Sequence, residues 1–158
     1  MEKIKSFTVN HMHLEPGIYE SRRDLINDCV ILTYDLRITR PNAEPVLNTA
    51  EVHTIEHLGA TFLRNHPKYK DRVIYFGPMG CRTGFYLVMA GELPNKTIFE
   101  IIQAMFEFIA LFEGKLPGGE AADCGNYLDH NLPMARWVAR KYLASLALIR
   151  DLSFTYPA

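Results

Sequence analysis

The clearest pattern along the chain is an alternation of side chains between residues 30 and 39. The odd-numbered positions are mostly polar, whereas the even-numbered positions are all apolar: Val30, Leu32, Tyr34, Leu36 and Ile38. A period of two is typical of a strand with one face in the core. Arg37 falls on the polar face of this predicted strand.

Three further segments predict strands. Residues 6–9 form a short strand-like run, and residues 72–76 and 85–90 form two apolar runs. The last two runs are joined by residues 77–84, which are too rich in glycine for the interior of a strand.

Helix signals follow in the remaining segments. Asn48 or Thr49 is a suitable N-cap, with Glu51 placed for a capping box, and this helix extends to about Asn65. A strongly apolar helix spans about residues 97–113.

A last helix starts after Asn131, has Pro133 in its first turn and continues through residues 136–148. Strands and helices do not alternate regularly along the chain. The order therefore favours an α+β fold, in which an antiparallel sheet packs against helices in a single domain.

Composition narrows the classes of protein. The 158 residues are 48% hydrophobic and 22% charged, with a formal net charge of -1 at pH 7. These values indicate one globular domain over residues 1–158, and they create no strong field for nucleic acid or anionic membranes. The longest apolar stretch, residues 98–112, is interrupted by polar side chains and is shorter than the roughly 18 residues of a membrane span. We therefore expect neither nucleic acid nor membrane as a partner.

The N-terminus and the cysteines predict a cytoplasmic protein. No apolar region follows the charges of residues 1–5, so a secretory signal is not expected. Three cysteines in such a chain argue for a reducing compartment rather than a disulfide framework. Cys29 lies at the start of the strand predicted from the alternation of residues 30–39, on what should be a packed edge, and we interpret it as structural.

Candidate chemistry begins with His53, Glu56 and His57, which form the inverted zinc-helix pattern H-x-x-E-H. Two histidines four residues apart lie one turn from each other on the same helix face, so both imidazoles can reach one metal ion. Glu56 leans toward the same face, where a carboxylate can move protons. The alternative reading is a chance pattern on a solvated helix face.

A catalytic metal site usually has three protein ligands and one open position. Cys124 is the best third ligand, because it lies in a loop before Gly125 and after a flexible Pro-Gly-Gly stretch. Two imidazoles and a thiolate suit Zn, Fe(II) or Co(II) and disfavour Mg or Ca. Cys124 could instead be a small buried thiol, and Asp129 or His130 could supply a ligand, although His130 before Asn131 looks more like a capping or surface residue.

Cys81 is a second reactive candidate. It lies between Gly80 and Arg82 in the glycine-rich linker, where a neighbouring cation and exposed amides would lower the pKa of its thiol. A core cysteine is the competing interpretation, which the glycine-rich surroundings disfavour.

Together these segments resemble the S-ribosylhomocysteine lyases, the LuxS family. The resemblance covers nearly the whole chain and rests on residues 6–11, 34–37, 41–42, 53–58, 78–86 and 124–125. Its most specific stretch is Pro-Met-Gly-Cys-Arg-Thr-Gly at residues 78–84.

The family resemblance implies roles for individual residues. The implied sets are metal ligands His53, His57 and Cys124, general acids and bases Glu56 and Cys81, and substrate-pocket residues Ser6, His11 and Arg37. The implied cofactor is one divalent metal ion per subunit, usually Fe(II), with Zn or Co as substitutes. The implied assembly is a homodimer with active sites at the subunit interface.

The resemblance also implies a reaction: cleavage of the thioether of S-ribosylhomocysteine to homocysteine and dihydroxypentanedione, an autoinducer precursor. This reaction would serve quorum sensing or salvage in the activated methyl cycle. The chain departs from the family at Asn10, where members often have Asp, and at residues 75–77, where Tyr-Phe-Gly replaces a frequent Asp-Ile-Ser. These departures leave the polar support around Cys81 and His11 open.

Two other classes of protein share part of this pattern. An inverted-motif metallopeptidase would need a distant glutamate as third ligand, such as Glu107 or Glu113, and would leave Cys81 without a role. A binding module with a structural zinc would need a fourth protein ligand to close the site.

Overall fold

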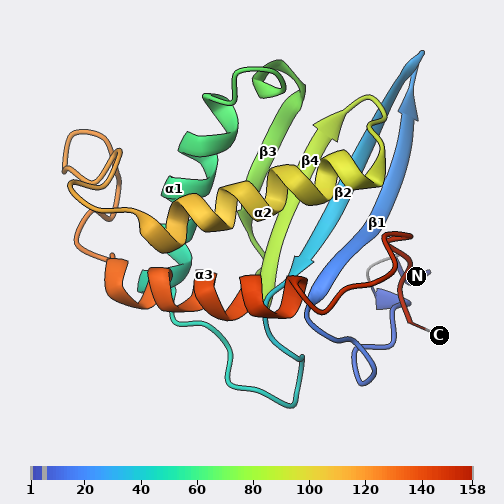
Figure 1. Ribbon diagram of the computed structural model, residues 1–158, viewed down its shortest axis with the longest axis horizontal. Coiled ribbons are helices and arrows are strands. Elements are labelled where there is room, and N and C mark those ends of the chain that lie inside the picture. Colours follow the sequence, from blue (N-terminus) through green and yellow to red (C-terminus); the bar gives the residue numbers. More distant parts are fainter. Residues whose placement is uncertain (1, 5–6, 158) are drawn as a thin grey trace.

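The fold is an antiparallel sheet packed against helices, as predicted (Figure 1). The computed structural model describes residues 2–4 and 7–157. Within these residues the strands are β1 (Gly17–Ile26), β2 (Cys29–Arg37), β3 (Val73–Pro78) and β4 (Gly84–Ala90), in the sheet order β1-β2-β4-β3. The helices are α1 (Thr49–Arg64), α2 (Asn95–Leu111) and α3 (Leu132–Leu146), with a short 3-10 helix η2 (Lys70–Arg72). All strand pairs are antiparallel, which confirms the α+β class.

The N-terminal part differs from the sequence prediction. Of the strand expected at residues 6–9, residues 7–9 form a turn instead, and Ser6 lies outside the described residues. The alternation pattern does not reveal β1, because its register against β2 shifts between Glu20 and Arg22. Such a bulge moves the following side chains to the other face of the sheet and so hides the period of two.

Cys29 is also corrected by the structure. It starts β2 as predicted, but its side chain is exposed rather than packed. The residue lies directly after the tight turn between β1 and β2, where the exposed Leu25 and Ile26 show that the hairpin extends beyond the core.

Helix boundaries follow the predicted signals. Glu51 returns to cap α1 by accepting a hydrogen bond from the Asn48 amide at 2.7 Å. Asn131 caps α3 by accepting from the Met134 amide at 3.1 Å, and a proline occupies the first turn. Among the described residues, no helix is long and apolar enough to cross a bilayer.

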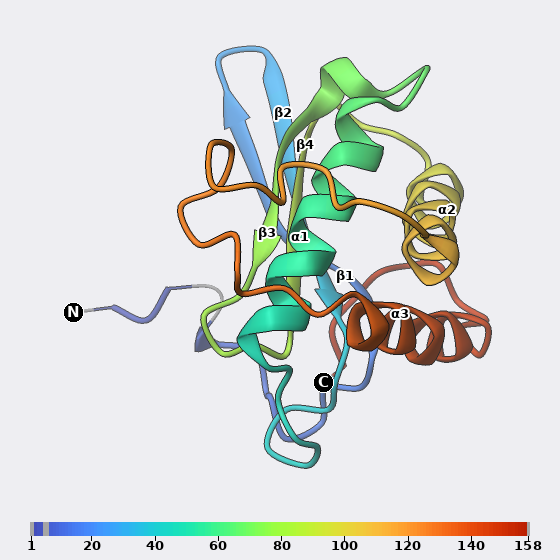
Figure 2. The same cartoon turned by 90° about the vertical axis from the view of Figure 1, so that its left-hand side faces the viewer.

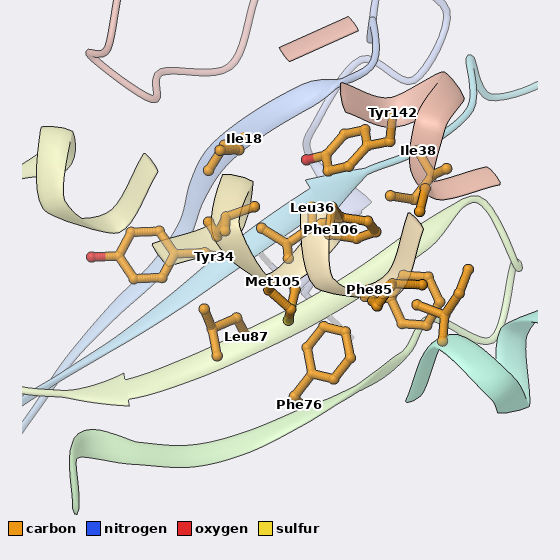
Figure 3. Close-up of a cluster of buried hydrophobic side chains, with 14 of the residues drawn as sticks. Ile18, Tyr34, Leu36, Ile38, Phe76, Phe85, Leu87, Met105, Phe106 and Tyr142 are labelled. Atoms are coloured by element: carbon orange, nitrogen blue, oxygen red, sulfur yellow. The ribbon is translucent and has the colours of Figure 1, made fainter. Parts of the chain in front are cut away.

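The core lies between the sheet and the helices α2 and α3, which cover one of its faces, while α1 packs beside β3 (Figures 1 and 2). Figure 3 shows side chains from β2, β3 and β4 meeting Met105 and Phe106 of α2 and Tyr142 of α3. The Tyr142 hydroxyl, fully buried, donates to the Gly17 carbonyl at 2.7 Å. The buried Tyr142 hydroxyl thus has a partner that offsets the cost of its burial.

The opposite face of β2 is less exposed than its polar residues suggest. Asp35 and Arg37 are only 0% and 2% exposed. They form a short ion pair between the Arg37 Nη2 and the Asp35 Oδ2, at 2.5 Å. A pair of charges in such a buried place is costly unless it is well bonded, which marks this end of the sheet as a candidate site.

Gly59 lies where α1 packs tightly against Phe76 of β3. A Cβ on Gly59 would overlap the Phe76 ring, at 3.0 Å from two of its carbons and nearer still to a third. An alanine normally favours a helix over glycine by about 1 kcal/mol. Here the clash reverses the sign, and we expect Gly59→Ala to lower the free energy of unfolding by about 1–3 kcal/mol in chemical denaturation. In the double variant with Phe76→Leu, part of this loss should be recovered; strictly additive losses would contradict the clash.

Candidate active site

The two histidines of α1, His53 and His57, each bond through Nδ1 to the backbone and keep Nε2 free for a shared ligand. The loop of residues 112–131 crosses over α1 (Figure 2), and two of its backbone carbonyls accept hydrogen bonds from the Nδ1 atoms of the two rings. The His53 Nδ1–H donates to the Asp129 carbonyl at 2.9 Å, and the His57 Nδ1–H donates to the Pro117 carbonyl at 2.8 Å. These bonds fix the tautomer of each ring and leave each Nε2 with a free lone pair, as metal-binding histidines require. Gly118, at φ +64, allows the loop to approach His57 this closely.

Cys124 reaches the same point from the crossing loop. Its Sγ lies 3.4 Å from the His53 Nε2, and the Asn126 amide donates to this sulfur at 3.4 Å. The Asn126 contact suits a thiolate ligand, because a backbone N–H stabilises its charge. The structure thus brings together the three side chains that the sequence predicts as metal ligands.

His130 joins this cluster, although the sequence pattern suggested a cap or a surface residue. The ligand atoms of His53, His57, Cys124 and His130 all lie within 4.8 Å of one another. The cap of α3 is Asn131 instead. Burial and the neighbouring His53 and His57 lower the pKa of His130, which favours its neutral form.

The donors fit a divalent metal ion. Within the described residues, the His130 Nε2 is buried beside these donors without a hydrogen-bond partner. Imidazoles with a thiolate form a borderline-soft set that suits Zn, Fe(II) or Co(II). We refer to His53, His57, Cys124 and His130 as the metal centre.

Glu56 lies at the edge of the metal centre. Its Oε2 is 3.7 Å from the His57 Nε2, and its side chain is about one-third exposed, at 32%. Glu56 and His53 line a cavity of about 370 Å³ together with Tyr75, Met79 and Gly80 among other residues. The carboxylate is therefore placed to exchange protons with a molecule in this cavity.

Cys81 belongs to a second group of polar side chains, located where β2 ends and β4 begins. The Arg37 Nη1 donates to the Thr83 Oγ1 at 2.5 Å, and the Thr83 Oγ1 lies 3.1 Å from the Cys81 Sγ. Because the Thr83 oxygen accepts from Arg37, its own hydrogen is free to donate to the sulfur. Arg37 itself lies 3.9 Å from the Cys81 Sγ.

These contacts decide the state of the Cys81 thiol. Partial burial raises its pKa, but hydrogen bonds from Thr83 and the charge of Arg37 outweigh burial, so the pKa is lowered from that of an ordinary thiol. A lowered pKa yields more thiolate near neutral pH, and a thiolate can accept a proton. The local setting that the sequence predicted for Cys81 was a neighbouring cation, and the cation in contact is Arg37 rather than Arg82.

We expect Thr83→Val to raise the pKa of Cys81. Removing the hydroxyl takes away one donor to the thiolate, so the midpoint of alkylation against pH should move up by about one unit and the rate at pH 7 should fall about tenfold. The measurement is iodoacetamide labelling, followed by mass spectrometry of the Cys81 peptide. Thr39→Val is the matched control, because the buried Thr39 hydroxyl has no partner among the described residues. Equal profiles for both variants would refute the role of Thr83.

Comparison with known proteins gives the chain its family. A sequence model of the family described as S-ribosylhomocysteinase (LuxS) matches residues 4–151. The chain is 58% identical over 157 residues to the S-ribosylhomocysteine lyase of Clostridium acetobutylicum, covering 99% of both chains. It is 55% identical over 158 residues to the protein of that name from Clostridium beijerinckii, and 56% identical over 157 residues to that from Finegoldia magna, again covering 99% of each chain. The chain belongs to the LuxS family.

Two of the remaining residues predicted from the LuxS resemblance, His11 and Arg37, line a second cavity. Both residues share this cavity of about 240 Å³ with Cys81 and Asp35. Their contact with a substrate stays a prediction. Ser6, predicted to join them, lies outside the described residues.

Tyr156 is a residue of this cavity that sequence reasoning missed. Its hydroxyl donates to the Asp35 Oδ2 at 2.9 Å, and its ring stacks on Tyr19 with centroids 4.9 Å apart. The Asp35 Oδ1 and the Arg37 Nε remain without partners among the described residues. No local motif announces Tyr156, because it reaches Asp35 from 121 residues away.

The departures from the LuxS pattern also have structural counterparts. Asn10 accepts a hydrogen bond from the Met12 amide at 3.1 Å and so shapes a turn. The Tyr75 ring lies against Gly77, where any Cβ would overlap its phenol group. Tyr75 and Gly77 are therefore coupled: the aromatic ring occupies space that a serine at position 77 would need.

In the part of the chain that the structure describes, the metal centre and the Cys81 group line different cavities. Glu56 and His53 line the larger cavity, whereas Cys81 and Arg37 line the smaller one. The two cavities have Met79 and Gly80 in common, which form the wall between them.

Proposed function

We propose that the chain is an S-ribosylhomocysteine lyase, which cleaves the thioether of S-ribosylhomocysteine to homocysteine and dihydroxypentanedione. The observation that carries this proposal is the pairing of a metal centre and its neighbour Glu56 with a thiol of lowered pKa, in a chain of the LuxS family. Dihydroxypentanedione would then feed autoinducer synthesis, and homocysteine would return to the activated methyl cycle.

The reaction needs proton carriers more than it needs a nucleophile. A thioether resists direct hydrolysis, but its C–S bond breaks readily once a carbonyl stands next to the carbon that carries the acidic proton. The sugar carbonyl must therefore move along the chain by successive shifts, each of which removes a proton from one carbon and returns one to its neighbour. In the last step a proton is removed, a C=C bond forms and the thiolate of homocysteine leaves with the electron pair.

Glu56 and Cys81 are the proposed carriers of these protons. Glu56 stands beside His57 at the edge of the metal centre, and the Cys81 thiolate is stabilised by Thr83 and Arg37. Two bases of different chemistry, placed on different walls, can serve different carbons of one substrate. A bound metal ion would act as a Lewis acid that stabilises negative charge on sugar oxygens next to the carbonyl.

The proposed metal is one divalent ion per subunit, Fe(II) first, with Zn or Co as substitutes. His53, His57 and Cys124 would hold it, since their donor atoms converge and the outer nitrogens of both rings are already bonded. A thiolate ligand favours these ions over Mg or Ca.

The proposed assembly is a homodimer in the cytoplasm with active sites at the subunit interface. The division of the proton carriers between two cavities supports it, because a partner could bring its Cys81 cavity to face this metal centre. Exposed apolar side chains around both cavities, such as Phe7 and Tyr75, are also consistent with a covered surface. The free thiols of all three cysteines accord with a reducing compartment.

The test combines elemental analysis of protein purified without oxygen with an assay for free thiol. Added S-ribosylhomocysteine should release one equivalent of homocysteine per molecule consumed, and the protein should carry about one metal ion per chain. Peptide cleavage without thiol release would support the metallopeptidase and overturn the proposal.

A structural zinc site is the second candidate, because His130 supplies the fourth donor that a closed site requires. Chelation followed by circular dichroism separates the two. A structural zinc should leave an unfolded chain, whereas a catalytic metal should leave the fold largely intact and the thiol release abolished.

A further inference from the structure

His130 is the one member of the metal centre whose role neither the H-x-x-E-H pattern nor the resemblance to the LuxS family assigns. Its ring is partly buried against the other two imidazoles, with ring centroids 4.0 Å from His53 and 4.8 Å from His57. Its Nε2 is buried and has no hydrogen-bond partner among the described residues. A polar atom in such a place costs free energy unless something in the working protein satisfies it.

The tautomer of His130 is set by Thr54. The Thr54 hydroxyl donates to the Ala50 carbonyl at 2.9 Å and accepts from the Asn131 amide at 2.9 Å. It has no second hydrogen to give, so the His130 Nδ1, 3.2 Å away, must be the donor in their contact. The His130 Nε2 therefore carries a lone pair, which needs a proton donor or a cation.

The orientation of the His130 ring argues against His130 and His53 binding the same cation. The rings of His130 and His53 are nearly parallel, at 21°, with centroids only 4.0 Å apart. At this separation parallel rings overlap face to face, because rings side by side in one plane could not come so close. The lone pair of Nε2 lies in the ring plane, so an ion in the plane of His53 lies well outside the plane of His130. His57, at 84° to His53, has no such conflict.

We propose that His130 binds the substrate: its Nε2 accepts a hydrogen bond from a hydroxyl group of the open sugar chain as that chain enters the metal centre. The ligand class is a polyhydroxylated carbon chain, since a hydroxyl is the group that can donate to Nε2 while offering its oxygen to the centre. This inference rests on the proposed lyase function. It assigns Thr54 as the residue that keeps the accepting tautomer, and His130 as the residue that selects hydroxyl over carbonyl oxygen.

The test uses three substitutions of His130 that separate the hydrogen-bond acceptor at Nε2 from the rest of the ring. A glutamine amide places an acceptor oxygen near the position of Nε2, whereas an asparagine amide reaches only the position of Nδ1. His130→Gln should thus stay within about threefold of the unsubstituted protein in kcat/KM, and His130→Asn should lose about tenfold or more, mainly through KM. His130→Phe, which keeps a ring against His53 but has no acceptor, should behave like His130→Asn.

Binding of cobalt gives a readout that does not depend on turnover. Without substrate, all three variants should bind one equivalent of Co(II) with the visible spectrum of the unsubstituted protein, because His130 is not a ligand. A lower stoichiometry or a changed ligand-field spectrum in His130→Asn and His130→Phe would show that His130 ligates the ion and would overturn the proposal. Equal kcat/KM values in Gln, Asn and Phe variants would overturn it as well.

Failure of this proposal is distinct from failure of the lyase assignment. If the unsubstituted protein releases no thiol, the assignment itself is wrong. If that protein is active and the Gln and Asn variants do not differ, only the role of His130 is wrong.

Discussion

Replacing Cys81 by Ala is expected to abolish thiol release while the metal content stays unchanged, and replacing Glu56 by Gln is expected to do the same. Each proton carrier contributes about a hundredfold to ten-thousandfold to the rate of such a step. Because the reaction needs several proton transfers in sequence, the loss at any one of them limits the whole turnover. Neither side chain is among the four that converge at the metal centre, so binding of the ion should survive.

His57→Ala is the comparison variant that distinguishes loss of a proton carrier from loss of a metal ligand. This variant removes an imidazole from the metal centre, so it should lose both the metal and the activity. Measuring metal by elemental analysis beside thiol release therefore separates proton carriers from ligands. Normal turnover in Cys81→Ala or Glu56→Gln would remove that residue from the mechanism.

Two controls match the substitutions in chemistry. Cys29→Ala removes an exposed thiol at the start of β2, outside both cavities, and should leave turnover unchanged. Glu107→Gln removes an exposed carboxylate of α2 that bonds to Gln103. Glu107 is also one of the two distant glutamates, with Glu113, that the metallopeptidase reading offers as a ligand, so a loss of metal in Glu107→Gln would favour that reading.

The sequence predicted the parts of this site that depend on local geometry. His53, Glu56 and His57 lie on one face of α1 because helical spacing alone puts them there, and the capping box of α1 follows from Asn48 and Glu51. For Cys81, the sequence predicted that a cation would lie nearby, but not which residue would supply it. Its cation comes from Arg37, 44 residues away, and not from the adjacent Arg82.

The rest could not be predicted, because it depends on contacts between distant segments. On the polar face of β2, the buried Asp35 accepts a hydrogen bond from Tyr156, which lies 121 residues away in the sequence. His130 changes from a presumed cap to a member of the metal centre because residues 112–131 fold back over α1, which a sequence pattern does not encode. The bulge in β1 hides its strand pattern for the same physical reason that makes the strand bend.

A mixture of two inactive variants is expected to regain activity. In a two-fold symmetric dimer with active sites at the interface, a site would combine the metal centre and Glu56 of one subunit with Cys81 of the other. A dimer of one Cys81→Ala chain and one Glu56→Gln chain would then contain one site with both residues intact and one with neither. Random association makes half of the dimers mixed, so the mixture should reach about a quarter of the unsubstituted activity.

The experiment needs subunits that exchange and can be told apart. Co-expressing the two variants with different tags and purifying through both tags yields the mixed dimer alone, which should have about half the activity of the unsubstituted dimer. Each variant purified in the same way with itself should stay inactive. Mixed dimers without activity would place Glu56 and Cys81 of one chain in one site, which the wall of Met79 and Gly80 between the two cavities argues against. A chain that remains monomeric at assay concentration yet releases thiol would remove the interface from the mechanism altogether.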